Sequence, residues 1–267
     1  MSDRKLSVKI QSAGYGRKEI IRCIGFESRA GELTGIIGPN GSGKTTLLKA
    51  ACGLLSAEGE VIWDGKNLLQ MNERERARTM GYIPQRSGIT ISVSVLDTVL
   101  MGFNPELRIF ENPDGEMIRK AFEALSAVGL RDLAEADFQK LSEGQKQLCI
   151  LARTIAAGRE ILFLDEPESA LDFSGRYRMA GLLMEAVKKT GGTAVLTLHD
   201  PQLAVNICDR LVMVKDGKTA GCILPGTDPL PVLEEKLCSL YGPLSVHRIA
   251  DRGGKERTVI LREETNG

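Results

Sequence analysis

The sequence predicts an α/β fold in which helices cover both faces of a mostly parallel sheet. Short, wholly apolar segments of strand length recur along the chain, and amphipathic segments with a helical period separate them. Strands of a parallel sheet are buried on both faces, so they form continuous apolar runs rather than alternating patterns. The 267 residues, 42% of them hydrophobic, are enough to form a sizeable core.

The first predicted strand is Leu33–Ile37, which a glycine-rich turn connects to a helical pattern extending to Leu54. Further strands are predicted at Glu60–Trp63, Met80–Ile83, Ile161–Leu164 and Thr193–Leu198. Two more, Leu211–Val214 and Thr219–Leu224, flank Asp216-Gly217, which is typical of a hairpin with a two-residue turn.

Two regions differ from this alternation. Residues 88–158 are dominated by amphipathic helical patterns, so we expect a helical subdomain there. After Pro225, the residues Gly226, Pro229 and Pro231 predict a linker. A small C-terminal extension follows, with a helical pattern at Leu233, Leu237 and Leu240 and an alternating segment at Thr258–Leu261. We therefore divide the chain into a main domain, residues 1–225, and an extension, residues 226–267.

Composition excludes several classes of protein. The 35 lysines and arginines balance 35 acidic residues, which removes the electrostatic case for a nucleic-acid-binding protein. No segment approaches the roughly 20 consecutive apolar residues of a membrane helix, and the start of the chain lacks a signal-peptide core. We expect a chain that stays in the cytosol, with a membrane partner still open. The six cysteines form no CxxC pair, which favours structural thiols over disulfides or metal ligands.

The strongest motif is Gly38-Pro39-Asn40-Gly41-Ser42-Gly43-Lys44-Thr45, with Thr46 next, standing between a predicted strand and a predicted helix. This GxxxxGK[ST] pattern in that context predicts a nucleotide triphosphate site. The glycines allow backbone N–H groups to surround a phosphate chain, and the following helix adds its positive N-terminal end. Lys44 is suited to the β- and γ-phosphates and the Thr45 hydroxyl to Mg²⁺.

A second candidate site is Asp165-Glu166, which ends the apolar run Ile161–Leu164. A buried parallel strand would deliver both acids to the carboxyl edge of the sheet, where ligands bind in open α/β folds. Asp165 could then join the Mg²⁺ shell, and Glu166 could polarise an attacking water. The alternative is that the two acids merely cap the next helix.

Leu141-Ser142-Glu143-Gly144-Gln145 has two interpretations that can both hold. Ser142 and Gln145 fit a capping box that opens a helix extending to Ala156. A helix N-terminus that carries a serine hydroxyl and a glycine backbone is also suited to binding an anion.

With these motifs in this order, the chain resembles the ATP-binding-cassette (ABC) family over about residues 5–225, because Leu141–Gln145 is similar to its LSGGQ signature. The resemblance implies a P-loop NTPase core of the ABC type with an inserted helical subdomain and a small antiparallel β part. It also implies ATP and Mg²⁺ as cofactors and a second copy of the chain as partner. In that head-to-tail dimer, each ATP lies between one phosphate loop and the partner's Ser142, Gly144 and Gln145.

The resemblance assigns roles to four further residues. Gln85 matches the glutamine that senses Mg²⁺ and the attacking water, and His199 matches the switch histidine that contacts the γ-phosphate. Asp172 matches the D-loop aspartate, and Tyr15 matches the aromatic residue that stacks on adenine. Taken singly, each has an ordinary alternative as a loop or turn residue, and His199 precedes Asp200-Pro201, a plausible start of a helix.

Two positions depart from the family pattern. Glu143 replaces the first glycine of the signature, which suits the helix dipole but would repel phosphate if the side chain turned inward. Glu168 stands where the family often has threonine.

Two classes of function remain. The resemblance implies a peripheral ATPase on the cytoplasmic face of the cell membrane that drives permease subunits, with a substrate-binding protein as a further candidate partner. The segments around Gln85 and Val95–Gly102 are similar to importers of iron chelates, haem and cobalamin, and residues 80–102 would hold the docking surface. The alternative is a soluble cassette acting on DNA or ribosomes, which this single, uninterrupted cassette fits less well. A GTPase would need an NKxD tetrad, which the sequence lacks.

Overall fold

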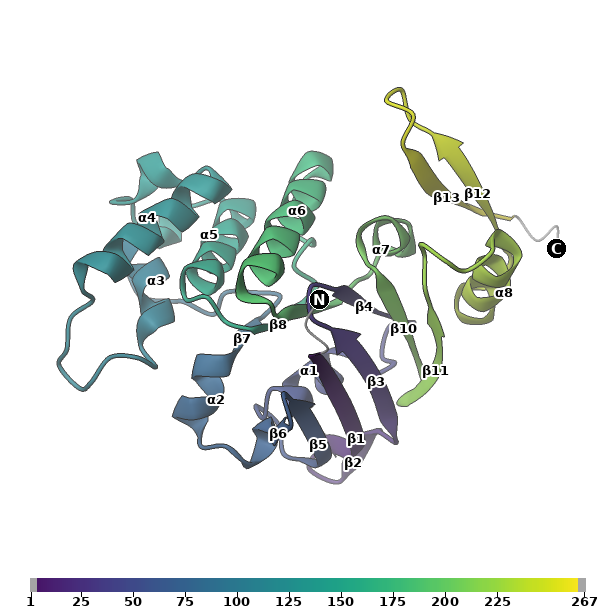
Figure 1. Ribbon diagram of the computed structural model, residues 1–267, viewed down its shortest axis with the longest axis horizontal. Coiled ribbons are helices and arrows are strands. Elements are labelled where there is room, and N and C mark those ends of the chain that lie inside the picture. The colour runs from purple at the N-terminus through teal and green to yellow at the C-terminus, as the bar shows by residue number, and fades with distance from the viewer. Residues whose placement is uncertain (1–3, 264–267) are drawn as a thin grey trace.

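A computed structural model describes residues 4–263 (Figure 1). The strands are β1 (Lys5–Tyr15), β2 (Lys18–Ile21), β3 (Ile24–Arg29), β4 (Leu33–Ile37), β5 (Ala57–Trp63), β6 (Lys66–Asn67), β7 (Met80–Ile83), β8 (Ile161–Asp165), β9 (Thr193–Thr197), β10 (Arg210–Lys215), β11 (Lys218–Ile223), β12 (Leu244–Ala250) and β13 (Glu256–Arg262). The α-helices are α1 (Lys44–Ala51), α2 (Glu73–Thr79), α3 (Val95–Leu100), α4 (Gly115–Val128), α5 (Glu143–Ala156), α6 (Phe173–Thr190), α7 (Pro201–Ile207) and α8 (Leu230–Tyr241). Short 3₁₀ turns lie at η1 (Leu68–Gln70), η2 (Met101–Phe103), η3 (Arg131–Leu133) and η4 (Phe138–Lys140).

The central sheet has the strand order β11-β10-β4-β9-β8-β7, in which only the edge strand β11 is antiparallel. All residues of β4, β8 and β9 are buried, as expected for parallel strands covered on both faces. Because these three strands are parallel neighbours, their carboxyl ends lie at one edge of the sheet. This edge carries the residues of the candidate site.

A second, antiparallel sheet is built around β1, which pairs with β2, β3 and β5, while β6 pairs with β5. Along β1, Leu6, Val8 and Ile10 are fully buried while the residues between them are not. This alternation turns one face of the sheet to the core and the other to solvent. Helix α1 packs between the two sheets, with Leu47 and Leu48 in the same apolar cluster as the inner face of β1.

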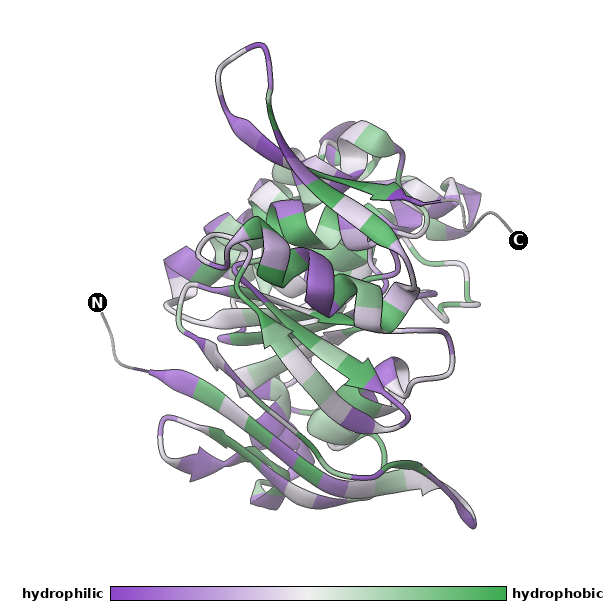
Figure 2. Cartoon of the chain, turned by 90° about the vertical axis from the view of Figure 1, so that its right-hand side faces the viewer, coloured by the Kyte–Doolittle hydropathy of each residue, from purple (hydrophilic) through white to green (hydrophobic). Residues whose placement is uncertain are grey.

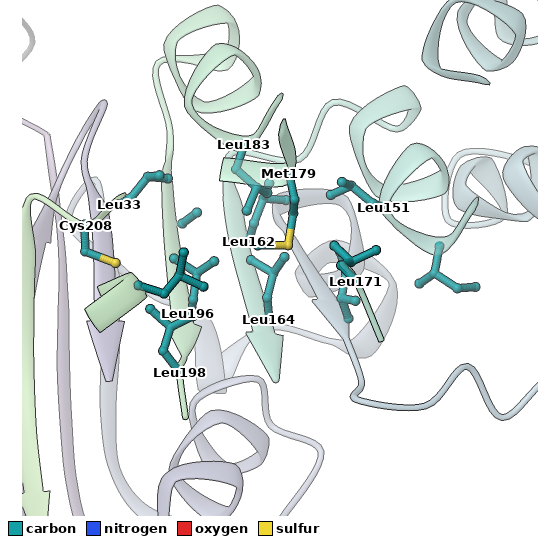
Figure 3. Packing of buried hydrophobic residues seen from close by; sticks show 14 of the residues in the cluster. Leu33, Leu151, Leu162, Leu164, Leu171, Met179, Leu183, Leu196, Leu198 and Cys208 are labelled. Carbon is teal, nitrogen blue, oxygen red and sulfur yellow. The ribbon is translucent and has the colours of Figure 1, made fainter. Parts of the chain in front are cut away.

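The opposite face of the central sheet is covered by helices from the rest of the chain (Figure 1). Figure 3 shows Leu162 and Leu164 of β8 and Leu196 of β9 packed with Met179 and Leu183 of α6. In Figure 2, apolar residues gather on the strands and helices inside the molecule, and polar residues gather on the outer strands and the C-terminal hairpin. The parallel sheet therefore contributes residues to both apolar clusters, one on each of its faces.

Helices α3, α4 and α5 pack against one another beyond the β7 edge of the sheet (Figure 1). A largely buried ion pair ties this helical part to the sheet, because Arg159, just before β8, contacts Glu106 and donates to the Gly102 carbonyl at 2.6 Å. The helical segment is thus attached next to β8, the strand that ends at the carboxyl edge of the sheet with Asp165.

The residues after Pro225 form α8 and the β12–β13 hairpin. Leu233, Leu237 and Leu240 point inward from α8 into the cluster on the helical face of the central sheet. The prediction of a linker is therefore wrong in part, since Pro229 is the N-cap residue of α8 and Pro231 lies in the first turn of that helix. Proline fits there because the first helical N–H groups need no intrahelical partner.

The predicted α/β class and the predicted strands of the central sheet are confirmed, with ends that differ by at most one residue. The strands β1, β2, β3, β6 and β12 were not predicted. All six cysteines are free, which confirms that they form no disulfides. Within residues 4–263, no helix is long and apolar enough to cross a membrane.

Replacing Leu237 by alanine tests whether the C-terminal helix is part of the main core. Leu237 is fully buried, so we expect the free energy of unfolding to fall by about 2–5 kcal/mol. The control is Leu261→Ala on β13, where the side chain is 53% exposed and the loss should stay below about 1 kcal/mol. Urea denaturation followed by circular dichroism measures both, and a second transition that alone shifts in Leu237→Ala would make the extension an independent unit.

Candidate functional site

The phosphate loop, residues 38–43, connects β4 to α1 in a backbone conformation that requires glycine. Gly41 and Gly43 have φ values of 77° and 106°, in the region that disfavours side chains. Gly43 also packs so closely on β2 that a Cβ atom would lie 2.8 Å from Ile21. A Cβ on Gly38 would lie 2.0 Å from the Val214 carbonyl oxygen of β10. Close packing against β2 and β10 therefore restricts the conformation of the loop.

Lys44 is buried at the first position of α1 and folds back over the loop. Its ammonium donates to the carbonyl oxygens of Gly38 at 2.8 Å and Pro39 at 3.2 Å. Burial lowers the pKa of Lys44, and the carboxylates of Glu166, Asp165 and Glu168 offset part of that effect. The Lys44 ammonium is thus held against the backbone of the glycine-rich loop.

Asp165, at the end of β8, contacts residues of the helix α1 and of the strands β9 and β7. Its Oδ1 accepts hydrogen bonds from the Thr45 hydroxyl of α1 at 3.0 Å and from the Thr197 hydroxyl of β9 at 2.8 Å. The Tyr82 hydroxyl of β7 lies 3.4 Å from Oδ2, and burial raises the pKa of Tyr82. This carboxylate is only 4% exposed.

Glu166 lies next to Asp165 with φ of 46°, a left-handed conformation that is uncommon for a residue other than glycine. Two contacts hold it there, since its N–H donates to the Thr197 hydroxyl at 2.9 Å and its carboxylate accepts from the Gln85 amide at 2.7 Å. Such strain concentrates at functional sites and persists only where the surroundings enforce it. The turn directs the two carboxylates to different side chains, Thr45 for Asp165 and Gln85 for Glu166.

His199 follows β9 at the same edge, with an exposed side chain. Its backbone N–H donates to the Glu168 carboxylate at 3.1 Å. The sheet therefore brings Lys44, Thr45, Asp165, Glu166 and His199 to one edge, although the sequence separates the first from the last by about 150 residues.

The start of α5 has the predicted capping box. The Ser142 hydroxyl accepts the Gln145 N–H at 3.2 Å, and the Gln145 side chain accepts the Ser142 N–H at 3.0 Å. Glu143 pairs with Lys146 at 2.9 Å, and its side chain is 74% exposed. Within residues 4–263, no hydrogen bond or ion pair links Ser142, Gly144 or Gln145 to the phosphate loop of the same chain.

Two other candidate residues, Tyr15 and Asp172, make no hydrogen bond or ion pair with Lys44, Asp165 or Glu166 among the described residues. Tyr15 ends β1 and is 48% exposed, on the hairpin whose second strand, β2, packs against the phosphate loop. Asp172 caps α6, where its carboxylate accepts the Gly175 N–H at 2.7 Å.

Thr197 is the residue that sequence reasoning missed. Its hydroxyl donates to Asp165 and accepts from the Glu166 N–H, so one side chain orients both acids. A threonine directly after three apolar residues at the end of a buried strand was the available signal, because a buried hydroxyl needs a hydrogen-bond partner.

The groups at this edge fit a magnesium-bound nucleotide triphosphate. The oxygen donors of Thr45, Asp165 and Gln85 are of the hard type that Mg²⁺ prefers. In residues 4–263, no cluster of three or more His, Cys, Asp or Glu forms a metal site. The buried Ser42 hydroxyl in the loop has no hydrogen-bond partner among the described residues, which also fits a phosphate.

Comparisons with known proteins agree on one family. A model of the ABC transporter family matches residues 21–169. An iron chelatin transport ATP-binding protein of Helicobacter pylori is 35% identical over 238 residues, 88% of this chain and 92% of the relative. A hemin import ATP-binding protein of a Ruegeria species is 34% identical over 239 residues, 86% of this chain and 88% of the relative.

Solved structures give the same result. A chain described as part of a metal-chelate type ABC transporter in an inward-facing conformation matches with a TM-score of 0.81 and 26% identity over 98% of both chains. A dimeric ATP-binding cassette with bound ADP and phosphate matches with a TM-score of 0.72 and 26% identity, over 82% of this chain and 98% of that one. The family match spans more than half of the sequence, so the chain belongs to the ABC transporter family as one of its ATP-binding cassettes.

Proposed function

We propose that this cassette hydrolyses magnesium-bound ATP and thereby powers the import of a metal chelate through separate membrane subunits. The observation that carries the catalytic part is the meeting of Lys44, Asp165 and Glu166 at the carboxyl edge of one sheet. A cation, a metal-binding acid and a second acid at a phosphate loop are the groups that phosphoryl transfer to water requires.

The residues divide the work as follows. Backbone N–H groups of residues 38–43 and the Lys44 ammonium bind the phosphate chain, and Tyr15 stacks on the adenine. Thr45, Asp165 and Gln85 hold Mg²⁺, which when bound neutralises charge on the phosphate oxygens. Glu166 accepts a proton from the attacking water. Gln85 orients the Glu166 carboxylate and the water.

The γ-phosphate is met by two further groups. His199 reaches it from the end of β9 in the same chain. Ser142, Gly144 and Gln145 reach it from a second copy, whose α5 N-terminus adds a positive dipole end. The exposed Glu143 pairs with Lys146 and so leaves the Ser142 hydroxyl facing the phosphate. A dimeric cassette with ADP and phosphate among the similar structures supports this arrangement.

The cargo proposal depends on the names of similar proteins, which specify iron chelatin transport, hemin import or a metal-chelate type transporter. The docking surface for the permease is proposed within residues 80–102. Here Val95 and Val99 are fully buried while Ile91 is 62% exposed, so only part of this segment is free to contact a partner. The alternative of a cassette acting on DNA or ribosomes is not favoured by these relatives.

Glu166→Gln tests the catalytic assignment. The amide cannot accept the water's proton, so we expect the rate of ATP hydrolysis to fall by about 10²- to 10⁴-fold. ATP binding should persist and leave a long-lived dimer, whereas Lys44→Ala should bind ATP poorly. Phosphate release and size-exclusion chromatography with ATP measure both properties, and hydrolysis at the wild-type rate would remove Glu166 from the mechanism.

A crosslink tests the site shared between two copies. In a background with exposed Cys23 changed to serine, the double variant Lys44→Ala, Ser142→Cys is mixed with wild-type chains. A thiol-reactive analogue of ATP carries its reactive group on the γ-phosphate. The double variant has a damaged phosphate loop, so the thiol introduced at position 142 should be labelled only through ATP held by a wild-type partner.

Mass spectrometry of the labelled peptide gives the readout, and Ser126→Cys on the exposed side of α4 controls for nonspecific labelling. Labelling that requires an intact Lys44 in the same chain as the introduced thiol would contradict the shared site.

Ile91→Glu tests the docking surface. A charge at this exposed position should release the cassette from membranes that contain its permease, because desolvating an unpaired carboxylate at an interface is unfavourable. ATP affinity should stay unchanged. Leu54→Glu is the matched control, since Leu54 is 61% exposed and lies outside the docking segment. Membrane sedimentation measures the bound fraction, and equal recovery of both variants would exclude Ile91 from the interface.

A further inference from the structure

Glu168 is an acid with an unusual environment. It lies in the turn that follows β8 and is only 3% exposed. Its Oε1 accepts the backbone N–H of His199 at 3.1 Å. Its Oε2 is completely buried and has no hydrogen-bond partner among residues 4–263. Acidic residues are almost never fully buried unless they are paired, so this side chain needs an explanation.

The charged groups around Glu168 do not supply a paired cation. Arg176 of α6 lies on one side but directs its guanidinium to Asp200, at 3.8 Å, and to the Leu171 carbonyl, at 3.2 Å. Burial lowers the pKa of Lys44 in α1 and the charge of Glu168 offsets part of that effect, but the Lys44 ammonium donates its hydrogen bonds to carbonyl oxygens of the phosphate loop. The remaining titratable neighbours supply no positive charge.

Those neighbours are the Glu166 carboxylate in the same turn, which repels a negative charge, and the thiol of buried Cys208 after α7, whose pKa is raised by burial and which is therefore neutral. A carboxylate here would lose its hydration and face a second carboxylate without an ion pair, which is costly. Burial foremost, and Glu166 next, raise the pKa of Glu168, while the N–H groups of Glu168 and His199 and the charge of Arg176 offset part of this rise.

We propose that Glu168 is a positioning residue which, as a neutral, protonated carboxyl, holds the main chain of His199 beside the nucleotide. The protonated group keeps Oε1 as an acceptor for the His199 N–H and leaves no net charge near the γ-phosphate. It therefore links the turn after β8, which carries Glu166, to the segment after β9, which carries His199. This inference depends on the proposed ATPase function of the site.

Two substitutions separate the hydrogen bond from the charge. Glu168→Ala removes the acceptor, so we expect kcat for ATP hydrolysis to fall about tenfold, the cost of one buried hydrogen bond to a main-chain donor. The KM for ATP should change by less than about twofold, because Lys44 and the phosphate loop are intact. Glu168→Gln keeps a neutral acceptor of the same shape and should restore kcat.

The pH dependence distinguishes a protonated carboxyl from a merely structural one. Because the proton is bound more tightly in the folded state, its contribution to stability is present at low pH. It is lost as pH rises from the ordinary glutamic acid range through the raised pKa. Wild type and Glu168→Gln should thus melt alike at low pH, and Glu168→Gln should melt at a higher temperature as pH rises.

The same divergence is expected in activity. Above the raised pKa, kcat of the wild type should fall relative to Glu168→Gln by up to about tenfold per pH unit. Glu185→Gln, at an exposed acid on α6, is the control and should follow the wild type in both assays.

Each outcome decides a separate point. A constant difference between wild type and Glu168→Gln at every pH, in melting temperature and in kcat, would show that Glu168 is charged and overturn the proposal. Wild-type kcat in Glu168→Ala would show that it does not position His199. If the wild type proved to have no ATPase activity, the proposed function would fail by itself, while the melting curves would still report the protonation of Glu168.

Discussion

The arrangement of the site depends on the hydrogen bonds that converge on Asp165. The strands β8 and β9 are parallel neighbours, and their register pairs Asp165 with Thr197. The Thr45 hydroxyl reaches the same carboxylate from α1. Because a buried carboxylate requires such partners, α1, β8 and β9 cannot shift relative to one another without leaving a charge unpaired. The phosphate loop, which leads into Thr45, is positioned by this constraint.

The rest of the fold supports the loop from the other side. The turn of the β10–β11 hairpin donates from the Gly217 N–H to the Ser42 carbonyl at 3.2 Å, and the Gly217 carbonyl accepts from the Arg22 N–H at 2.7 Å. One turn therefore connects the phosphate loop to the segment after β2, in the antiparallel sheet. The close packing of Gly38 and Gly43 against β10 and β2 leaves the loop no room to relax. Such a loop is organised before a ligand binds, which reduces the entropic cost of binding.

A hydrogen bond from Gln85 connects Glu166 to residues 80–102, the segment proposed to dock on the permease. Gln85 contacts Glu166 at one end of the segment after β7, and the same segment continues through Ile91 to the cap of α3 at Ser94. Farther along the chain, beyond α3 and η2, Glu106 is joined to the sheet through Arg159. A movement of a partner at Ile91 would thus reach the Gln85–Glu166 contact along continuous chain, which gives the proposed coupling of transport to hydrolysis a physical route.

The sequence by itself determined the α/β class, the strands of the central sheet, the phosphate loop and the capping box of α5. Each of these depends on local chemistry, such as apolar runs, glycines with positive φ, and a serine three residues before a glutamine. It did not reveal the long strand β1, where only alternate residues face the core, nor the packing of α8 against the helical face. Only the tertiary structure decided that Thr197 orients both acids and that Glu168 lies buried against the main chain of His199. Those contacts join residues about 30 positions apart, and parallel strand pairing alone brings them within hydrogen-bonding distance.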